Sequence, residues 1–259
     1  MSDWHRVDGE LAAWCRGEGP RLVFVHGFTQ TSTSWKPIAD HFATGGYQAV
    51  VVDAPGHGGS TTIHADLVRA AELVTSVCGA AVYIGYSMGG RLCLHAATMH
   101  PGQVRGLALV GASPGIADEG DRAARRVADE QLADHIEHIG VAAFLDEWLA
   151  RPLFEGLVVD DEERADRCRN SADGLAGSLR LSGTGAQASL WPRLKELTMP
   201  VLTMAGELDT KFVAIGRKMA TAVSAGHFEA IAGAGHAAHL QDPVQVIAVL
   251  RRWLQKIDH

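Results

Sequence analysis

The chain has 259 residues and a formal net charge of −7, and 47% of its residues are hydrophobic while 20% are charged. This composition is typical of a globular domain that folds in water, and the excess of acids excludes a general attraction to nucleic acid or to an anionic membrane surface. No apolar run approaches the roughly 20 residues that span a bilayer, and residues 1–14 contain no apolar signal core. We therefore expect a cytoplasmic protein with no nucleic-acid and no membrane partner.

The spacing of cysteines and histidines gives no sign of a disulfide framework or of a metal site. No two cysteines form a C-x-x-C pair, so free thiols in a reducing compartment are expected at Cys15, Cys78, Cys93 and Cys168. The histidine pairs at 135/138 and 236/239 have no third ligand at a recognisable metal spacing. We therefore expect no metal and no cofactor.

Short apolar runs of β type alternate with helical patterns, which predicts an α/β fold with a mostly parallel central sheet flanked by helices. The expected strands cover residues 21–27, 47–58 (a strand that ends in a Pro/Gly loop), 80–85, 104–111, 199–206 and 227–233. The expected helices cover residues 34–44, 62–78, 88–99, 213–223 and 242–257. The last helix begins at Asp242-Pro243, an N-cap followed by proline at the first helical position.

The alternation of strands and helices pauses over residues 114–192, where the sequence reads as charged helices. One modest apolar stripe is expected there, at Val127, Leu132, Ile136 and Ile139. The segment begins after one strand and ends before the next, so it can vary without disturbing the sheet. We expect a core of residues 1–113 and 193–259 and a helical lid of residues 114–192 that covers the active site.

The segment "YIGYSMGG", residues 83–90, places Ser87 between glycines directly after an apolar run. The pattern Gly85-x-Ser87-x-Gly89 matches the nucleophile elbow, a strained strand-to-helix turn that exposes a serine hydroxyl at the end of a sheet. The alternative is that Ser87 only caps the following helix. In that case the flanking glycines would be a needless entropic cost.

A serine that gains or loses a proton needs a histidine, and the histidine needs an acid to orient it. Asp209, in "AGELDTKF", follows the strand expected at 199–206, and His236, in "AGAGH", follows the last expected strand. The order serine, acid, histidine is that of the elbow-type fold. Because catalytic groups of open α/β sheets gather at the carboxyl ends of the strands, we expect a triad of Ser87, His236 and Asp209.

Two other residues could take the place of the acid and of the histidine in this triad. Asp53 also follows a strand, but it leads into a turn of its own, "APGHG"; His239 is an alternative to His236, but the helix that follows would aim it elsewhere. His26 and His57 are expected to stabilise loops rather than to act in catalysis.

An oxyanion hole requires two backbone N–H groups, one after the nucleophile and one from the loop after an earlier strand. Met88 supplies the first of them. Phe28, in "VHGFTQ", supplies the second, with Gly27 allowing a tight turn.

The motifs "VHGF", "DAPGHGGS", "GYSMGGR" and "GAGH" resemble those of the α/β-hydrolase superfamily. Within the 114–192 segment, "SPG" and "WLARPLF", together with "GTGAQASLW", are similar to the lid of the 2-succinyl-6-hydroxy-2,4-cyclohexadiene-1-carboxylate synthase family of menaquinone biosynthesis. The resemblance extends over nearly the whole chain. It implies a lyase that eliminates pyruvate from a cyclohexene carboxylate bearing an enolpyruvyl ether and a succinyl arm. Ser87 would then remove a ring proton, and the oxyanion hole would hold the charge that develops on the succinyl carbonyl oxygen.

The substrate implied by this resemblance is a small polycarboxylate, and arginine is suited to planar bidentate recognition of carboxylates. Matching the family motifs, Arg91, Arg125 and Arg169 are expected to bind the substrate, and Tyr86 and Trp148 are expected to line the pocket. Without the resemblance, Arg125 and Arg169 read equally well as solvated surface charges.

Two other functions remain open from the sequence. A serine carboxylesterase or carbon–carbon bond hydrolase would use the same triad for nucleophilic attack, since the fold does not fix the reaction. A non-catalytic receptor would use the pocket for binding alone, although an intact triad argues against it. Dehalogenase or epoxide hydrolase chemistry needs an acidic nucleophile at the elbow, which Ser87 excludes.

Overall fold

An eight-stranded sheet forms the centre of the computed structural model, which describes residues 3–257. The strands lie in the order β1-β2-β4-β3-β5-β6-β7-β8. Their bounds are β1 His5–Val7, β2 Ala13–Arg16, β3 Arg21–Val25, β4 Gln48–Val52, β5 Ala81–Tyr86, β6 Val104–Val110, β7 Val201–Gly206 and β8 Gly226–Ile231. Strands β3 to β8 are parallel, whereas β2 pairs antiparallel with β4 and β1 pairs antiparallel with β2.

The six parallel strands confirm the predicted α/β fold. Strands β5 and β7 are buried along their whole length, as expected of parallel strands that are covered on both faces. The sequence does not predict β1 and β2 because their three and four residues mix charged and apolar side chains. Strand β2 takes its place in the sheet by pairing with β4, a later element of the chain, and β1 is joined to the sheet only through β2.

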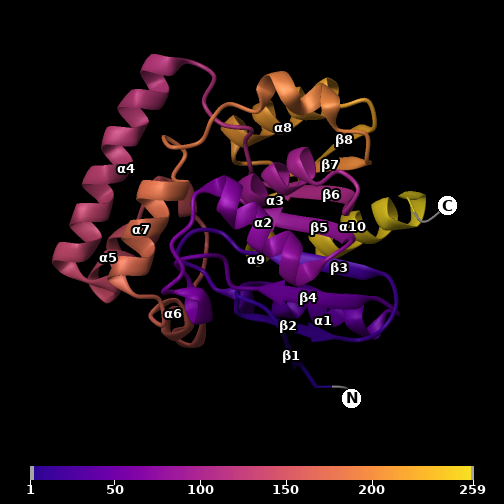
Figure 1. Ribbon diagram of the computed structural model, residues 1–259, viewed down its shortest axis with the longest axis horizontal. Helices are drawn as coiled ribbons and strands as arrows, with labels where there is room; N and C mark the ends of the chain where they lie inside the picture. The colour runs from indigo at the N-terminus through magenta and orange to yellow at the C-terminus, as the bar shows by residue number, and fades with distance from the viewer. Residues whose placement is uncertain (1–2, 258–259) are drawn as a thin grey trace.

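Helices cover both faces of the sheet, and each face has its own hydrophobic core (Figure 1). Their bounds are α1 Lys36–Thr44, α2 Leu67–Cys78, α3 Met88–Met99, α8 Thr210–Ala222, α9 Ala238–Gln241 and α10 Pro243–Ile257, with short 3-10 turns η1 Ser32–Trp35, η2 Gly58–Ser60 and η4 Trp191–Glu196. Strand β3 illustrates the division, because successive side chains of a strand point to opposite faces. Val23 and Val25 pack in the cluster that includes α2 and α3, whereas Leu22 and Phe24 pack in the cluster that includes α1 and α10.

Helix α10 shows how closely the local sequence determines an element. The carboxylate of Asp242 accepts a hydrogen bond from the backbone N–H of Gln245 at 2.8 Å, and Pro243 occupies the first helical position, as predicted. Its buried residues recur every three or four positions, at Val246, Val249, Leu250, Trp253 and Leu254. Within residues 3–257, no helix has both the length and the apolar character needed to cross a bilayer.

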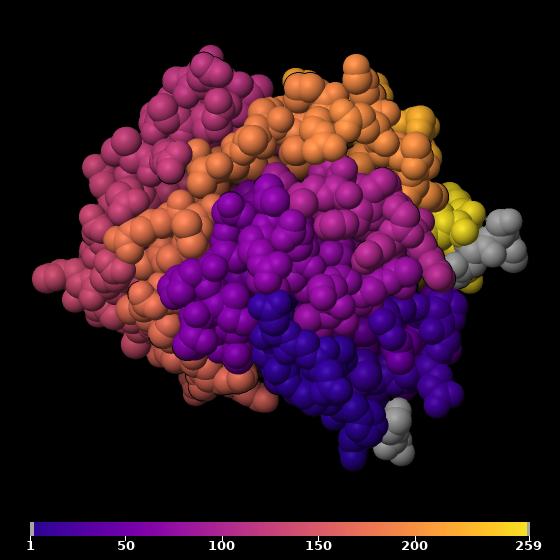
Figure 2. Space-filling model, in the orientation of Figure 1, coloured from indigo at the N-terminus to yellow at the C-terminus, as the bar shows by residue number. Residues whose placement is uncertain are grey.

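Between β6 and β7 the chain leaves the sheet and forms a separate group of helices, here called the insertion. Its elements are α4 Glu119–Ile139, α5 Val141–Leu149, η3 Pro152–Phe154, α6 Asp161–Arg167 and α7 Ala172–Ser182. Figure 1 shows α4 to α7 gathered on one side of the molecule, away from the C-terminus, and Figure 2 shows insertion and core meeting in one continuous surface. The insertion has a small core of its own, which includes Ile136, Phe144 and Leu175. The expected stripe on α4 is wrong at Val127, which is 58% exposed, but Leu132, Ile136 and Ile139 do pack at the core of the insertion, where Asp129 and Ala133 are also buried.

Several histidines are buried in the core, and burial favours their neutral form. Burial lowers the pKa of His57 to about 3, with a smaller contribution from neighbouring His26. Burial also lowers the pKa of His95 to about 4, helped by the charges of Arg91 and Arg193. In the unfolded chain these imidazoles take up a proton below about pH 6.5. Because the unfolded state then binds more protons than the folded state, the free energy of unfolding falls as the pH is lowered through 6.5.

We expect the free energy of unfolding to fall by about 2 kcal/mol for each of His57 and His95 between pH 7 and pH 5. Urea denaturation at pH 7, 6 and 5 measures this loss. The variant His95→Gln should lose less stability over the same range, whereas His5→Gln, at an exposed position, should match the unmodified protein. Equal pH dependence in His95→Gln and in the unmodified protein would contradict the prediction.

Candidate active site

Ser87 lies at the turn between β5 and α3, with φ 49° and ψ −107°, a backbone region that residues with a Cβ rarely adopt. Its side chain makes no capping hydrogen bond to α3, so the helix-cap alternative does not describe this serine. The neighbouring glycines have a steric role. A Cβ on Gly85 would lie 2.5 Å from the carbonyl oxygen of Gly89, and a Cβ on Gly89 would lie 2.3 Å from that of Val25. The glycines therefore allow α3 to approach the sheet directly behind Ser87.

A hydrogen-bond relay joins Ser87 to an acid. Ser87 Oγ lies 3.2 Å from His236 Nε2, and Asp209 Oδ2 lies 2.6 Å from His236 Nδ1. A carboxylate can only accept, so Nδ1 donates to Asp209 and Nε2 is free to accept from the Ser87 hydroxyl. The backbone N–H of Phe212 donates to the other carboxylate oxygen at 3.3 Å, which fixes the acid. The arrangement suits removal of the serine proton by the histidine.

Close backbone approaches bring these groups together at the carboxyl edge of the sheet. A Cβ on Gly206, at the end of β7, would lie 2.0 Å from the carbonyl oxygen of Gly235. This contact sets the loop that carries Asp209 against the loop that carries His236. Gly111, at the end of β6, has φ 56°, and a Cβ there would lie 3.1 Å from Cε1 of His236. Glycine at these positions thus leaves room for the relay.

The structure separates His236 from its rival His239. His239 lies between the rings of Trp35 and Tyr86, with centroid distances of 4.5 and 4.2 Å. Neither of its ring nitrogens has a hydrogen-bond partner among the described residues, and burial lowers its pKa well below the ordinary value. It therefore packs behind the site and does not contact Ser87.

Asp53 and His26 also have structural roles. Asp53 accepts the backbone N–H groups of Ser32 and Gly59, each at 2.7 Å. His26 Nε2 accepts the N–H of Ala54 at 3.0 Å. Both side chains join the loops after β3 and β4, as the sequence predicts for His26.

The two backbone N–H groups predicted for the oxyanion hole belong to residues that line the same cavity as Ser87. Met88 is the first residue of α3, so its N–H has no acceptor within the helix. Phe28 follows the tight turn at Gly27, where a Cβ would lie 2.5 Å from the ring of Tyr86. Each N–H is thus carried by a turn that its neighbours hold tightly.

The cavity beside Ser87 consists of two adjoining spaces. One, of about 180 Å³, is lined mainly by aromatic and apolar side chains, among them Tyr86, Trp148 and Phe154. The other, of about 270 Å³, is lined by residues that include Ser113 and Trp191. The residues that line both spaces are Ser87, Arg91, Arg125, Thr184, Lys211 and Phe212. A ligand that extends into both spaces therefore passes Ser87 and three cations.

The three cations differ in how they are held. Arg91 is 8% exposed and donates to the carbonyl oxygen of Ser182 at 2.7 Å. Burial, followed by the charge of Arg125, lowers its pKa to about 10, so it stays protonated at neutral pH. Arg125 Nε donates to buried Asp129 at 2.6 Å. Lys211 is exposed and forms no ion pair within residues 3–257, so its charge is available to a ligand.

The sequence model described as "Alpha/beta hydrolase family" matches residues 22–249. The chain is 32% identical over 244 residues to the 2-succinyl-6-hydroxy-2,4-cyclohexadiene-1-carboxylate synthase of Salmonella newport (strain SL254), covering 91% of this chain and 94% of that one. It is 35% identical over 247 residues to the putative synthase of the same name from Bacillus subtilis (strain 168), covering 87% and 88%. The chain belongs to this synthase family within the alpha/beta hydrolases.

Solved structures agree with this assignment. The structure of MenH from S. aureus superposes with a TM-score of 0.89 at 30% identity over the full length of both chains. A thermophilic esterase from Thermogutta terrifontis superposes with a TM-score of 0.79 at 21% identity over 99% of both chains, and this second likeness shows the fold alone. The resemblance predicted from the motifs is confirmed.

Of the residues that the synthase family resemblance assigns to the substrate, four line the cavity: Tyr86, Arg91, Arg125 and Trp148. Arg169 does not. Its side chain is 54% exposed, and Nη1 donates to Asp166 at 2.8 Å. Arg169 lies just after α6 and is not part of the cavity wall in this structure, so its role in substrate binding stays a prediction.

The sequence did not indicate three side chains that line the cavity beside Ser87. Lys211 and Phe212 line both spaces, and Phe154 lines the smaller one. The centroid of the Phe212 ring lies 4.6 Å from that of His236, and the Phe154 ring lies 6.3 Å from it. Lys211 and Phe212 could have been found from their position shortly after Asp209 in "LDTKF". For Phe154 the sequence offers only its place in "WLARPLF".

We expect Gly89→Ala to lower the free energy of unfolding by about 1–3 kcal/mol, because the added methyl group overpacks α3 against the backbone of β3. Gly102→Ala is the matched control, since a Cβ at Gly102 meets nothing within 4 Å. Urea denaturation of both variants measures the difference. A Gly89→Ala variant as stable as Gly102→Ala would show that α3 does not need this approach.

Proposed function

We propose that the protein eliminates pyruvate from an enolpyruvyl succinyl-cyclohexene carboxylate to give 2-succinyl-6-hydroxy-2,4-cyclohexadiene-1-carboxylate, in menaquinone biosynthesis. The relatives with which it shares about a third of its residues carry this activity in their names. The observation that carries the proposal is that a Ser–His–Asp relay opens onto a cavity with three cations at the wall common to its two spaces. That combination suits proton removal from a small polycarboxylate.

In the proposed reaction, Ser87 acts as the base. His236 accepts the hydroxyl proton at Nε2 while Ser87 Oγ takes the ring proton next to the succinyl carbonyl, and Asp209 stabilises the imidazolium. The electron pair of the broken C–H bond passes toward the succinyl carbonyl oxygen, where the N–H groups of Phe28 and Met88 receive the negative charge. When this charge returns to the ring, its electron pair forms a new ring double bond, the existing ring double bond shifts toward the carbon that bears the ether, and the electrons of the broken C–O bond leave with the enolpyruvyl oxygen. The released enolate takes up at carbon the proton that the His236 imidazolium gives up and becomes pyruvate; Ser87 keeps the ring proton as its hydroxyl proton, so the relay is restored and no acyl-enzyme forms.

The cations give the substrate its orientation. Arg91 and Arg125 present planar guanidinium groups that suit carboxylates, and Lys211 adds a compact charge that lies over the Phe212 ring and forms no ion pair with any residue between 3 and 257. Tyr86 and Trp148 supply apolar walls for the ring. The protein is acidic as a whole, so these local charges have to attract the anionic substrate against the overall field.

We also propose that residues 114–192 form the lid subdomain and that residues 1–113 with 193–259 form the core. In support, the insertion contributes Arg125, Trp148 and Phe154 to the cavity wall, together with Leu179 and Thr184. The core contributes the relay and the backbone donors. The four cysteines are free thiols, which supports the proposed cytoplasmic location.

We expect Ser87→Ala to lower pyruvate release by on the order of 10³-fold or more, because the catalytic base is removed. Pyruvate release from the enolpyruvyl intermediate is followed with lactate dehydrogenase and NADH. Ser76→Ala, an exposed position on α2, should leave the rate unchanged.

The same proteins are tested against nitrophenyl esters. Rapid ester turnover with a trapped acyl-Ser87, and no pyruvate from the folded unmodified protein, would replace the proposed lyase with a serine hydrolase.

We expect Lys211→Met to raise KM about tenfold with a smaller change in kcat, because a charge that attracts the substrate carboxylates is lost while the relay is intact. The effect should shrink as salt is raised, since an exposed charge is screened. Lys195→Met, on an exposed part of η4, removes the same charge away from the cavity and serves as the control. Equal KM values for the two variants would exclude Lys211 from substrate binding.

A further inference from the structure

Thr29 directly follows the proposed oxyanion donor Phe28 and has an unusual backbone. Its φ is 69°, in the left-handed region, and only Thr29 and Ser87 among the described non-glycine residues have positive φ. For a β-branched residue this conformation is unfavourable, so it persists only where the surroundings fix it. The conformation of Thr29 sets the direction in which the preceding peptide unit, and with it the loop at Phe28, enters the cavity.

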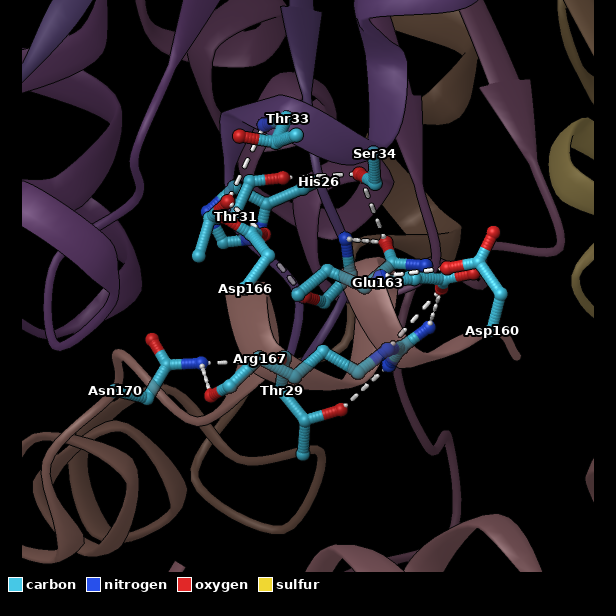
Figure 3. Close-up of polar contacts among 12 residues, drawn as sticks. His26, Thr29, Thr31, Thr33, Ser34, Asp160, Glu163, Asp166, Arg167 and Asn170 are labelled. Carbon is cyan, nitrogen blue, oxygen red and sulfur yellow. Dashed lines mark hydrogen bonds and ion pairs between the residues drawn. The ribbon is translucent and has the colours of Figure 1, made fainter.

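Two side chains from the insertion hold Thr29 (Figure 3). Asn170 Nδ2 donates to the carbonyl oxygen of Thr29 at 2.9 Å, and Arg167 Nη1 donates to its hydroxyl oxygen at 2.9 Å. The partners are separated by more than 130 positions in the sequence. The contact therefore joins the end of α6 directly to the loop after β3.

Asn170 uses both ends of its amide. Nδ2 also donates to the carbonyl oxygen of Arg167 at 2.9 Å, and Oδ1 accepts the backbone N–H of Gly58 at 2.8 Å. The side chain thus links three backbone segments: the loop after β3 that carries Phe28 and Thr29, the loop after β4, and the end of α6. No other side chain of similar size combines two N–H donors with a carbonyl acceptor on so short a stem.

The contacts of Thr29 with Arg167 and Asn170 are buried, so water does not compete for these hydrogen bonds. Thr29 is fully buried, Arg167 is 2% exposed and Asn170 is 5% exposed. The Arg167 charge is compensated within α6, where Glu163 Oε1 accepts from Nη2 at 2.5 Å and from Nε at 3.1 Å. Arg167 does not line the cavity, in contrast to Arg91 and Arg125.

We propose that Asn170, supported by Arg167, is a positioning residue for the oxyanion hole: it holds Thr29 in the left-handed conformation and thereby aims the N–H of Phe28 at the developing oxyanion. The inference rests on the proposed function in taking Phe28 as the donor. In this proposal the insertion helps to stabilise the developing oxyanion in addition to covering the cavity.

The test compares Asn170→Asp with Glu162→Gln, which changes an exposed side chain on α6, the helix that precedes Asn170. An ionised aspartate keeps the acceptor for Gly58 but removes the N–H donor and faces the Thr29 carbonyl oxygen with a negative charge. We expect kcat for pyruvate release to fall about 30-fold, less than the 10²–10³-fold for outright loss of an oxyanion donor. KM should stay within about threefold because the cations are intact. Glu162→Gln should match the unmodified protein in both constants.

A second measurement follows the Phe28 amide itself. Protein labelled with [15N]phenylalanine has seven phenylalanines, and Phe28→Leu identifies the signal of interest. In Asn170→Asp the Phe28 signal should move while signals of distant phenylalanines stay in place; Glu162→Gln should move none. If Asn170→Asp does not fold, Asn170→Ala is examined in the same way.

An unchanged kcat, or an unmoved Phe28 signal in a folded variant, overturns the inference. So does a general shift of all phenylalanine signals with a parallel loss of stability, which is the result of a purely structural role. Should the unmodified protein release no pyruvate, the proposed function fails separately. The positioning role is then decided by the Phe28 signal and by hydrolysis of nitrophenyl esters, which needs the same oxyanion hole.

Discussion

The site depends on backbones approaching one another more closely than a side chain allows. A Cβ at Gly206 would lie 2.0 Å from one carbonyl oxygen of the facing loop, and a Cβ at Gly89 would lie 2.3 Å from one of β3. These contacts fix the separations of three strand ends before any polar interaction is considered. The distances of 3.2 and 2.6 Å within the relay of Ser87, His236 and Asp209 follow from this packing. The hydrogen bonds then select the tautomer and orientation of a ring that already lies in place.

Electrostatics divides the molecule into an acidic exterior and a cationic cavity. A buried guanidinium such as that of Arg91 loses hydration, and this loss lowers its pKa. Its hydrogen bond to a backbone carbonyl restores part of that hydration without neutralising the charge. Had a carboxylate stood in that place, as Asp129 does for Arg125, the charge available to a ligand would be smaller. The backbone carbonyl partner of Arg91 therefore preserves more of the positive potential of the cavity than a carboxylate would.

The sequence predicts the parts of the site that local rules determine. Ser87, Asp209 and His236 each follow a strand, and parallel strands end at one edge of a sheet, so short patterns are enough to bring them together. The arginines of the insertion are a different case. Arg167 and Arg169 are two residues apart at and just after the end of α6, and the buried one, Arg167, donates a hydrogen bond to Thr29, 138 positions away. No local pattern contains that contact, and for the same reason the short strands β1 and β2 escape prediction.

The hydrogen bond between Arg167 and Thr29 ties the insertion to the loop after β3. From the sequence, a segment that leaves after one strand and returns before the next appears free to vary. In the structure its helices supply cavity walls, and Asn170 and Arg167 bind the loop that carries a proposed oxyanion donor. Movement of α6 away from the core would break hydrogen bonds that keep Thr29 in an unfavourable conformation, and the loop would relax. In the proposed mechanism, closure of the insertion and assembly of the oxyanion hole would then be one event, so that Ser87 would meet a complete charge-stabilising site only when the cavity is covered and water is displaced from it.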